Sequence, residues 1–451
     1  MKKLEAWIIT SVFVALIAVP IVAFATGARP EPNQNRPPTP LPDISVEGVL
    51  DRELSTQLDA YLEDALIIAP GAVAAEAWTD VVVGDSPSED VTLGENGWLY
   101  YTFSLTRPCL STGDVERFAD AVARAQRVVE ATGRKLIVAI APDKAAIIPD
   151  FLPDRETCVH EVAEALQDLD GSGILVMVWD EMRRARANDR PIYFRLDTHW
   201  TNEGAGVMAE AIVEELHPGG WNEDAVRVVD TVDHEGDLTV LLGLPDTEPT
   251  EELESLLPGT VLQREIRTLQ TVTGADHEGV VAVDFSIDGG PPLSERTLVL
   301  HDSYGWALTP MLAGYFEEAT FIAESDPAAG HLVYDLDQAE TIIFELVQRS
   351  VHELILDKDL AAGFVSAYAD DLPVSEQGTR VTGERLEFAA TVGDTYVVVE
   401  LAPGADAAEA AYNDTTAKLN PDSPRAAFYV GGGGTMYFAG EVDYQVVSVA
   451  R

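Results

Sequence analysis

Two short stretches of this chain carry residues whose types and spacing could do chemistry. Asp197 stands two positions before His199, and Ser303 follows a short apolar run that ends at Leu300. A serine, a histidine and an aspartate can act together as nucleophile, base and orienting carboxylate. An Asp-x-His spacing lets one loop carry both the base and the group that orients it. The pattern predicts Ser303, His199 and Asp197 as catalytic residues.

The position of the serine suggests where an oxyanion would be held. Ser303 follows a predicted strand, and backbone amides at the start of a following helix could receive the oxyanion of an acyl-transfer reaction. The hydroxyl of Tyr304 is a further candidate donor.

Each of these residues also has an alternative interpretation. Ser303 could only cap a helix, Asp197 could form an Asx turn, and His199 could be a core histidine bonded to the backbone. A metal site is another alternative, because Asp197, His199, His301 and Asp302 are ligand types that suit zinc or manganese. Ser303 would have no role in such a site, so the triad is the preferred interpretation.

The elements that must position these residues alternate between strands and helices. Apolar runs predict strands over 136–141, 174–178, 192–196, 297–300 and 341–344. Helical patterns run from Asp114, as the cap, to Ala131, where Gly133 ends the helix, over 156–169, through the arginines of 183–186, and from a capping Asn202 to Leu216. Strands separated by helices imply an α/β fold with a parallel sheet covered on both faces. Ligands bind beyond the carboxyl ends of such strands, where Ser303 and the Asp197–His199 loop could converge.

The residue composition and the apolar pattern change on both sides of this region. Beyond residue 370, β-branched and aromatic runs split by Gly and Pro predict a small C-terminal antiparallel β domain over 371–451. Before it, the predicted catalytic domain covers 44–370, and a proline-rich stretch over 29–43 predicts a stiff linker.

Residues 1–28 predict a single-pass transmembrane signal anchor in the cell membrane. Lys2 and Lys3 precede a mostly apolar run over 6–28, which as a helix would span roughly 34 Å. The positive-inside rule places these lysines in the cytoplasm and the bulk of the chain outside. A cleavable signal with its cleavage site near residues 23–25 is the alternative.

Composition limits the partners and the compartment. The formal net charge of −48, from 77 acidic and 29 basic residues, excludes nucleic acid and anionic lipid headgroups as specific partners. The only two cysteines, Cys109 and Cys158, exclude a zinc finger, and an oxidising exterior permits a disulfide between them. Two unrelated buried thiols are the alternative.

Several motifs together resemble a known family. They are Asp197-Thr198-His199-Trp200-Thr201, Asp302-Ser303-Tyr304, Gly94-Glu95-Asn96-Gly97-Trp98-Leu99-Tyr100, Ala141-Pro142-Asp143-Lys144 and Phe344-Glu345-Leu346-Val347-Gln348-Arg349. Over about residues 91–356 the chain resembles the SGNH-hydrolase-like domain of alginate O-acetyltransferases, which are extracytoplasmic polysaccharide acetylation proteins. In that family, as here, the Asp and the His precede the Ser. One departure is His301-Asp302 before the serine, where relatives often carry Gly with a small or acidic residue.

The resemblance implies an O-acetyltransferase that acts on a cell-surface or secreted polysaccharide. An acetyl group on Ser303 would pass to a sugar hydroxyl, with His199 as base and Asp197 as orienter. The resemblance implies no cofactor, and it implies a membrane-bound O-acyltransferase as the partner that supplies acetyl. A polysaccharide acetyl esterase with the same triad and a non-catalytic polysaccharide-binding or assembly protein are the alternatives.

Three further side chains are candidates for substrate binding. Lys144 could neutralise an acidic substrate or be an ordinary surface lysine. Arg349 could contact substrate or pair with Glu345, four positions earlier on a helix. Tyr304 is the third candidate, as the oxyanion donor named above.

Overall fold

A computed structural model of the chain describes residues 81, 84–153, 157–167, 175–270, 280–288, 293, 296–324, 332–352, 360–381, 385–388, 394–413, 415–419 and 424–449. The predicted anchor over 1–28 and the predicted linker over 29–43 lie outside the described residues. Among the helices that the structure does describe, none is both long and apolar enough to cross a membrane.

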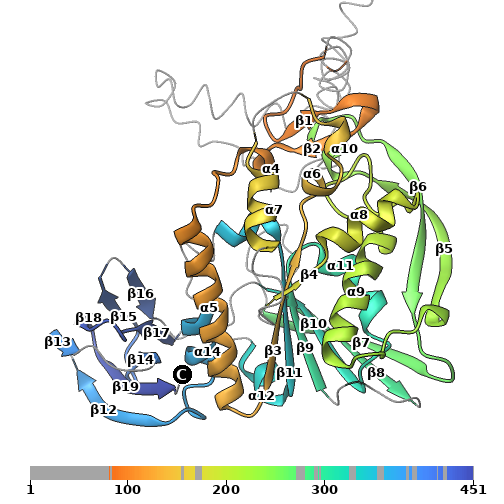
Figure 1. Cartoon of the computed structure of the whole chain (residues 1–451). Helices are drawn as coiled ribbons and strands as arrows, with labels where there is room; N and C mark the ends of the chain where they lie inside the picture. Colours follow the sequence, from red (N-terminus) through yellow and green to blue (C-terminus); the bar gives the residue numbers. More distant parts are fainter. Residues whose placement is uncertain are drawn as a thin grey trace, which may run out of the picture.

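A seven-stranded mixed sheet forms the centre of the larger part of the molecule (Figure 1). Its strands in spatial order are β4 (Leu175–Met177), β3 (Lys135–Ala141), β11 (Thr341–Val347), β9 (Arg296–His301), β10 (Glu318–Ala323), β8 (Val280–Asp288) and β7 (Val261–Gln270). The first five run parallel, whereas β8 pairs antiparallel with both of its neighbours, β10 and β7. The α/β class is therefore confirmed, and the antiparallel edge is an addition that the sequence did not predict.

Helices cover this sheet on two sides. On one side α5 (Thr112–Ala131) packs against α14 (Leu360–Ala367), and on the other α8 (Trp179–Ala187), α9 (Asn202–Leu216) and α11 (Gly305–Leu312) lie together (Figure 1). The shorter helices are α4 (Thr102–Thr106), α6 (Lys144–Ile147), α7 (Val159–Gln167) and α12 (Val333–Gln338), and β1 (Val91–Leu93) pairs with β2 (Leu99–Tyr101). Strand β11 is buried along its whole length, as expected for a parallel strand between two helical layers.

The residues that cap two helices lie earlier in the chain than predicted. Ser111, not Asp114, caps α5, and Asp114 completes a reciprocal capping box with it. Thr201, not Asn202, caps α9 with its side chain. Gly133 has a φ of 81° just after α5, which agrees with its predicted role as the stop of that helix.

The predicted strand over 192–196 is wrong. Residues 191–201 form an irregular loop in which Tyr193 makes an isolated bridge to Trp200. Ile192, Tyr193 and Leu196 are buried, so their apolar character reflects packing in the core without pairing in a sheet. Asp197 and His199 belong to this loop.

An antiparallel hairpin stands beside this loop. It consists of β5 (Val226–Glu235) and β6 (Thr247–Ser255), with the short helix α10 (Asp237–Leu241) between them (Figure 1). We call residues 226–255 the arm. No pattern in the sequence predicted the arm.

The C-terminal region contains two four-stranded antiparallel sheets, as predicted in kind. One has the order β12 (Val374–Val381), β19 (Val442–Val449), β14 (Asp394–Leu401), β17 (Arg425–Tyr429), and the other β13 (Arg385–Phe388), β18 (Gly434–Ala439), β15 (Ala408–Tyr412), β16 (Thr415–Leu419). Residues such as Val397, Phe428 and Met436 form a core of their own. The Arg127 guanidinium of α5 bonds to the buried Asp394 carboxylate at 2.7 and 2.9 Å and so ties this region to the larger part.

Candidate active site

Asp197, His199 and Ser303 lie in a chain of hydrogen bonds beyond the carboxyl end of β9. His199 Nε2 is 2.7 Å from Ser303 Oγ, and His199 Nδ1 is 2.7 Å from Asp197 Oδ1. Asp197 is buried, the His199 side chain is 25% exposed, and Ser303 is open to solvent. In this geometry the imidazole can accept the serine proton while the carboxylate fixes its orientation.

The turn that presents Ser303 is fixed on both sides. Asp302 Oδ1 accepts the amide of Tyr304 at 2.9 Å, and Oδ2 accepts the amide of Val347 at the end of the neighbouring strand at 2.7 Å. Gly305 begins α11 against the His301 ring, where an added Cβ would lie 2.1 Å from the ring. Only glycine allows the chain to turn so closely over β9.

Four N–H groups hold the Asp197 carboxylate. Oδ1 accepts the ring Nδ1–H and the backbone amide of His199, and Oδ2 accepts Nε2–H of His234 at 2.9 Å and the amide of Asp237 at 3.0 Å. Burial alone would raise the pKa of Asp197, but the hydrogen bonds from His199 and His234 outweigh it and hold the pKa well below its usual range. The carboxylate is therefore ionised and oriented.

The arm also binds the backbone of the loop. Glu248 accepts the amide of Arg195 at 3.1 Å and that of Leu196 at 2.7 Å. Asp237 Oδ1 accepts the amide of Thr198 at 2.7 Å. These bonds satisfy the polar groups of a loop that has no regular secondary structure.

Lys144 supports the same loop from the opposite side. Its buried ammonium donates to the carbonyls of Leu99, Arg195 and Asp197 at 2.5, 3.0 and 2.9 Å. Burial lowers the pKa of Lys144 to about 7, although nearby carboxylates oppose the shift. The sequence suggested that this amine could neutralise an acidic substrate, but in this structure it is hydrogen-bonded to carbonyls of the protein.

Tyr304 and Arg349 are likewise occupied by protein partners. The Tyr304 hydroxyl is fully buried and donates to the carbonyl of Thr198 at 2.9 Å, so it is not placed to receive an oxyanion. Arg349 pairs with the buried Asp143 at 2.8 Å. The alternative pairing of Arg349 with Glu345 on a helix is wrong, because Glu345 lies on strand β11.

The four residues considered as a metal set do not form one cluster. His301 is buried, with Nδ1 on the carbonyl of Asp302, and both carboxylate oxygens of Asp302 accept backbone amides. Within the described ranges, the group near the serine whose ligand-type atoms lie within 4.8 Å of one another is Asp197, His199 and Asp237. Its central contact, between Asp197 and His199, is the one already described.

Cys109 and Cys158 are joined by a disulfide, with their Cα atoms 4.9 Å apart. The bond links the loop before α5 to the residue that precedes α7.

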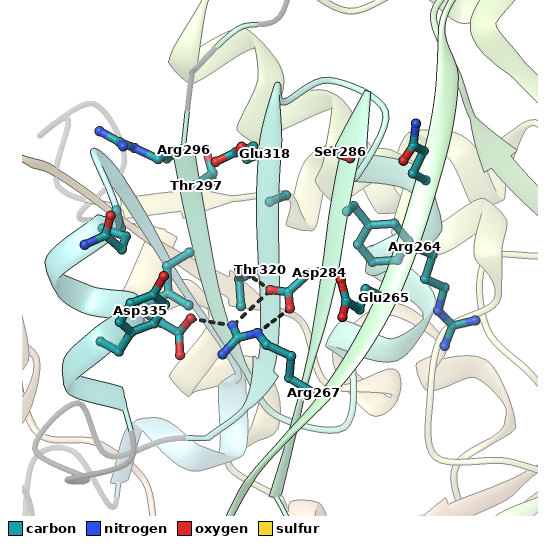
Figure 2. Close-up of a pocket in the computed structure, with 17 residues that line it drawn as sticks. Arg264, Glu265, Arg267, Asp284, Ser286, Arg296, Thr297, Glu318, Thr320 and Asp335 are labelled. Carbon is teal, nitrogen blue, oxygen red and sulfur yellow. Dashed lines mark hydrogen bonds and ion pairs between the residues drawn. The ribbon is translucent and has the colours of Figure 1, made fainter. Parts of the chain in front are cut away.

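A separate polar pocket of about 470 Å³ lies on the face of β7, β8 and β10 (Figure 2). Arg267 reaches across it and bonds to Asp284 and Asp335, and Thr320 donates to Asp284. Arg296, at the amino end of β9, also lines the pocket, whereas Ser303 follows the carboxyl end of that strand. The pocket is therefore distinct from the triad.

Comparison with known proteins relates the first half of this structure to a family. Residues 91–274 match the family model described as the SGNH hydrolase-like domain of acetyltransferase AlgX. This range contains Asp197 and His199 but not Ser303. The chain is 30% identical over 167 residues to a probable alginate O-acetylase AlgJ of Pseudomonas syringae pv. tomato, over 34% of this chain and 41% of the relative. It is 28% identical over 229 residues to the protein of the same name in Azotobacter vinelandii, over 47% of this chain and 55% of the relative.

The chain thus spans about half the length of these relatives, or less. Among solved structures, the O-acetyltransferase domain of Pseudomonas putida AlgJ is similar, with 18% identity, a TM-score of 0.41 and coverage of 60% of this chain and 95% of that chain. PatB1 of Bacillus cereus, solved with a sulfonyl adduct, is also similar, with 14% identity, a TM-score of 0.42 and coverage of 58% of this chain and 97% of that chain. On the family match, residues 91–274 are similar to the SGNH hydrolase-like domain of acetyltransferase AlgX.

Proposed function

We propose that this protein transfers acetyl groups to hydroxyls of a polysaccharide through an acetyl-serine at Ser303. The observation that carries the proposal is the contact of 2.7 Å between His199 Nε2 and Ser303 Oγ, with Asp197 on the other ring nitrogen. The match of residues 91–274 to an acetyltransferase domain supports the type of reaction.

In the first half of the reaction, Ser303 Oγ attacks the acetyl carbonyl of the donor while His199 Nε2 takes the hydroxyl proton. The carbonyl electron pair moves to its oxygen and gives a tetrahedral oxyanion. Collapse of this intermediate breaks the bond to the leaving oxygen, which takes the proton from His199. Asp197 stabilises the imidazolium that forms between these two transfers.

In the second half, a sugar hydroxyl gives its proton to His199 and attacks the acetyl carbon. Collapse of the new intermediate breaks the bond to Ser303 Oγ and returns the proton to that oxygen. The products are an acetylated sugar and free serine. No step needs a cofactor.

The acceptor that we propose is a polysaccharide, and alginate is one candidate because the named relatives are probable alginate O-acetylases. Alginate is a polyanion, and this chain carries a formal net charge of −48. Repulsion between the two would slow binding at low ionic strength, so neutral glycans are the second class to test. We further propose that residues 1–28 anchor the protein with its bulk outside the cytoplasm, where a membrane-bound O-acyltransferase supplies acetyl.

The test uses an activated acetyl ester with and without acceptor glycans. Intact-mass measurement should find one added acetyl group on the wild type and none on Ser303→Ala. A well-placed sugar hydroxyl can reach effective molarities of about 10⁵ M or more, far above water at about 55 M, so the right glycan should divert acetyl from hydrolysis to transfer. If a broad glycan panel is never acetylated but acetylated glycans lose acetyl through Ser303, the protein is an esterase.

A further inference from the structure

We infer that His234 is a positioning residue for the triad, holding Asp197 in the orientation that His199 requires. The inference rests on the proposed function for its effect on rate. The effect of His234 on the contact between Asp197 and His199 can be measured without any substrate.

His234 enters the site from the arm. It lies on β5, and its Nε2–H donates to Asp197 Oδ2 at 2.9 Å. Its ring stacks on Phe194 of the same loop, with ring centroids 4.0 Å apart and an interplanar angle of 14°. One contact fixes the nitrogen and the other fixes the plane, so the ring has little freedom to turn away.

The two carboxylate oxygens of Asp197 have different hydrogen-bond partners. Oδ1 faces His199, and Oδ2 faces His234 and the Asp237 amide. Without the His234 donor, one backbone amide is left to hold Oδ2. Rotation of the carboxylate would then move Oδ1 away from His199, and a misplacement of about 1 Å in such a site can cost about 100-fold in rate.

The surroundings of His234 add an electrostatic effect. The charged groups that face it are Asp197 from the loop, Glu248 from the paired strand of the arm and Asp237 from α10, all acidic. The hydrogen bond to Asp197 is the main cause that raises the pKa of His234, and burial opposes it. The protonated ring of His234 is a charge-assisted donor, and this strengthens its bond to the Asp197 carboxylate.

Two substitutions separate these effects. His234→Phe keeps a ring that can stack on Phe194 but removes the donor. His234→Gln keeps a donor nitrogen near the place of Nε2 but carries no charge at any pH. We expect His234→Phe to lower kcat/KM for an activated acetyl ester by about 10- to 100-fold, mainly through kcat. We expect His234→Gln to recover most of this loss, because its amide nitrogen restores a donor to Asp197 Oδ2.

A second measurement does not depend on catalysis. NMR of ¹⁵N-labelled histidines in the full chain should show that the signal of the His199 Nδ1–H proton, which the Asp197 carboxylate accepts, changes in His234→Phe and is kept in His234→Gln. An unchanged signal together with unchanged rates in folded His234→Phe would overturn the inference. If the signal changes as expected but Ser303→Ala still hydrolyses the ester at the wild-type rate, the proposed function fails and the positioning role stands.

Discussion

His199 Nε2 and Ser303 Oγ are 2.7 Å apart in space and 104 positions apart in the sequence. The irregular loop supplies the histidine and the end of β9 supplies the serine, so the contact exists only when the sheet, α11 and the arm are all in place.

The first prediction concerns the triad. Ser303→Ala and His199→Ala should each abolish release of acetyl from an activated ester, because members of one triad act as a unit. Asp197→Ala should leave more activity, since its role is to orient and stabilise the imidazolium. Circular dichroism should show that all three variants remain folded. A chelator should change nothing. Loss of activity on chelation with full activity of Ser303→Ala would favour a metal mechanism.

The second prediction concerns Lys144. Lys144→Met removes a donor from three carbonyls, of which that of Arg195 still accepts the amide of Leu99, and each carbonyl left unsatisfied should lower the free energy of unfolding by about 1–3 kcal/mol. The pKa of Lys144 is lowered to about 7 in the folded chain, from 10.5. The unfolded chain therefore binds more protons between pH 7 and pH 10.5, and this group makes the free energy of unfolding rise with pH across that window. Urea denaturation should show a flatter rise in Lys144→Met. The exposed Lys135→Met serves as the control, and equal slopes in the two variants would contradict the prediction.

The third prediction concerns Glu345, which is fully buried on β11. Neither of its carboxylate oxygens has a hydrogen-bond partner among the described residues. Burial raises the pKa of Glu345 well above the ordinary value of 4.5. The folded state therefore binds more protons than the unfolded state above pH 4.5, and stability falls as pH rises through that window.

Glu345→Gln removes this dependence without changing the size of the side chain. It should increase the free energy of unfolding at pH 7 by up to about 3 kcal/mol, and the gain should shrink toward pH 4.5. Thermal unfolding across this pH range measures the effect. A variant that is less stable than the wild type at pH 7 would show that the ionised carboxylate is accommodated.

The fourth prediction concerns the contact between the arm and the loop over residues 191–201 that carries Asp197 and His199, which we call the catalytic loop. At Gly236 an added Cβ would lie 2.3 Å from the Leu196 carbonyl oxygen, so Gly236→Ala must push the loop and the arm apart. Both ester hydrolysis and stability should fall, because Asp197 loses its donors from the arm. Gly432→Ala is the matched control, since an added Cβ there meets nothing within 4 Å. Equal activity in the two variants would mean that the arm does not set the position of the loop.

The fifth prediction concerns the disulfide. A bond between Cys109 and Cys158 closes a long loop and should stabilise the fold by about 4 kcal/mol in the chain-entropy model. Thiol labelling of the denatured, unreduced protein should find no free cysteine. Labelling of both cysteines under those conditions would contradict the bond.

The sequence predicted the parts of the fold that have a strong local signature. Apolar runs correctly identified β3, β9 and β11, and the strand predicted over 174–178 is β4 in the structure. The strand predicted over 192–196 was wrong because burial in a packed loop produces the same apolar pattern as burial in a sheet. The arm was missed because β5 and β6 are largely exposed, so neither carries an apolar period.

In the site, too, the residues with a local sequence signature could be predicted and the others could not. Asp197, His199 and Ser303 could be proposed because they form short motifs in the family order, and the structure places them in contact. His234 and Glu248 could not, because their roles depend on where the arm folds back. The only local signal is the cluster His234-Glu235-Gly236-Asp237, which has no spacing typical of a known site.

The arm holds the catalytic loop mainly through main-chain amides, and this has a consequence for how the protein can change. Glu248 and Asp237 bind the amides of positions 195, 196 and 198 whatever side chains these positions carry. Leu196 and Thr198 are buried and constrained by packing, but Arg195 is only partly buried. The side chain at position 195 can therefore be exchanged without displacing Asp197 and His199 beside it.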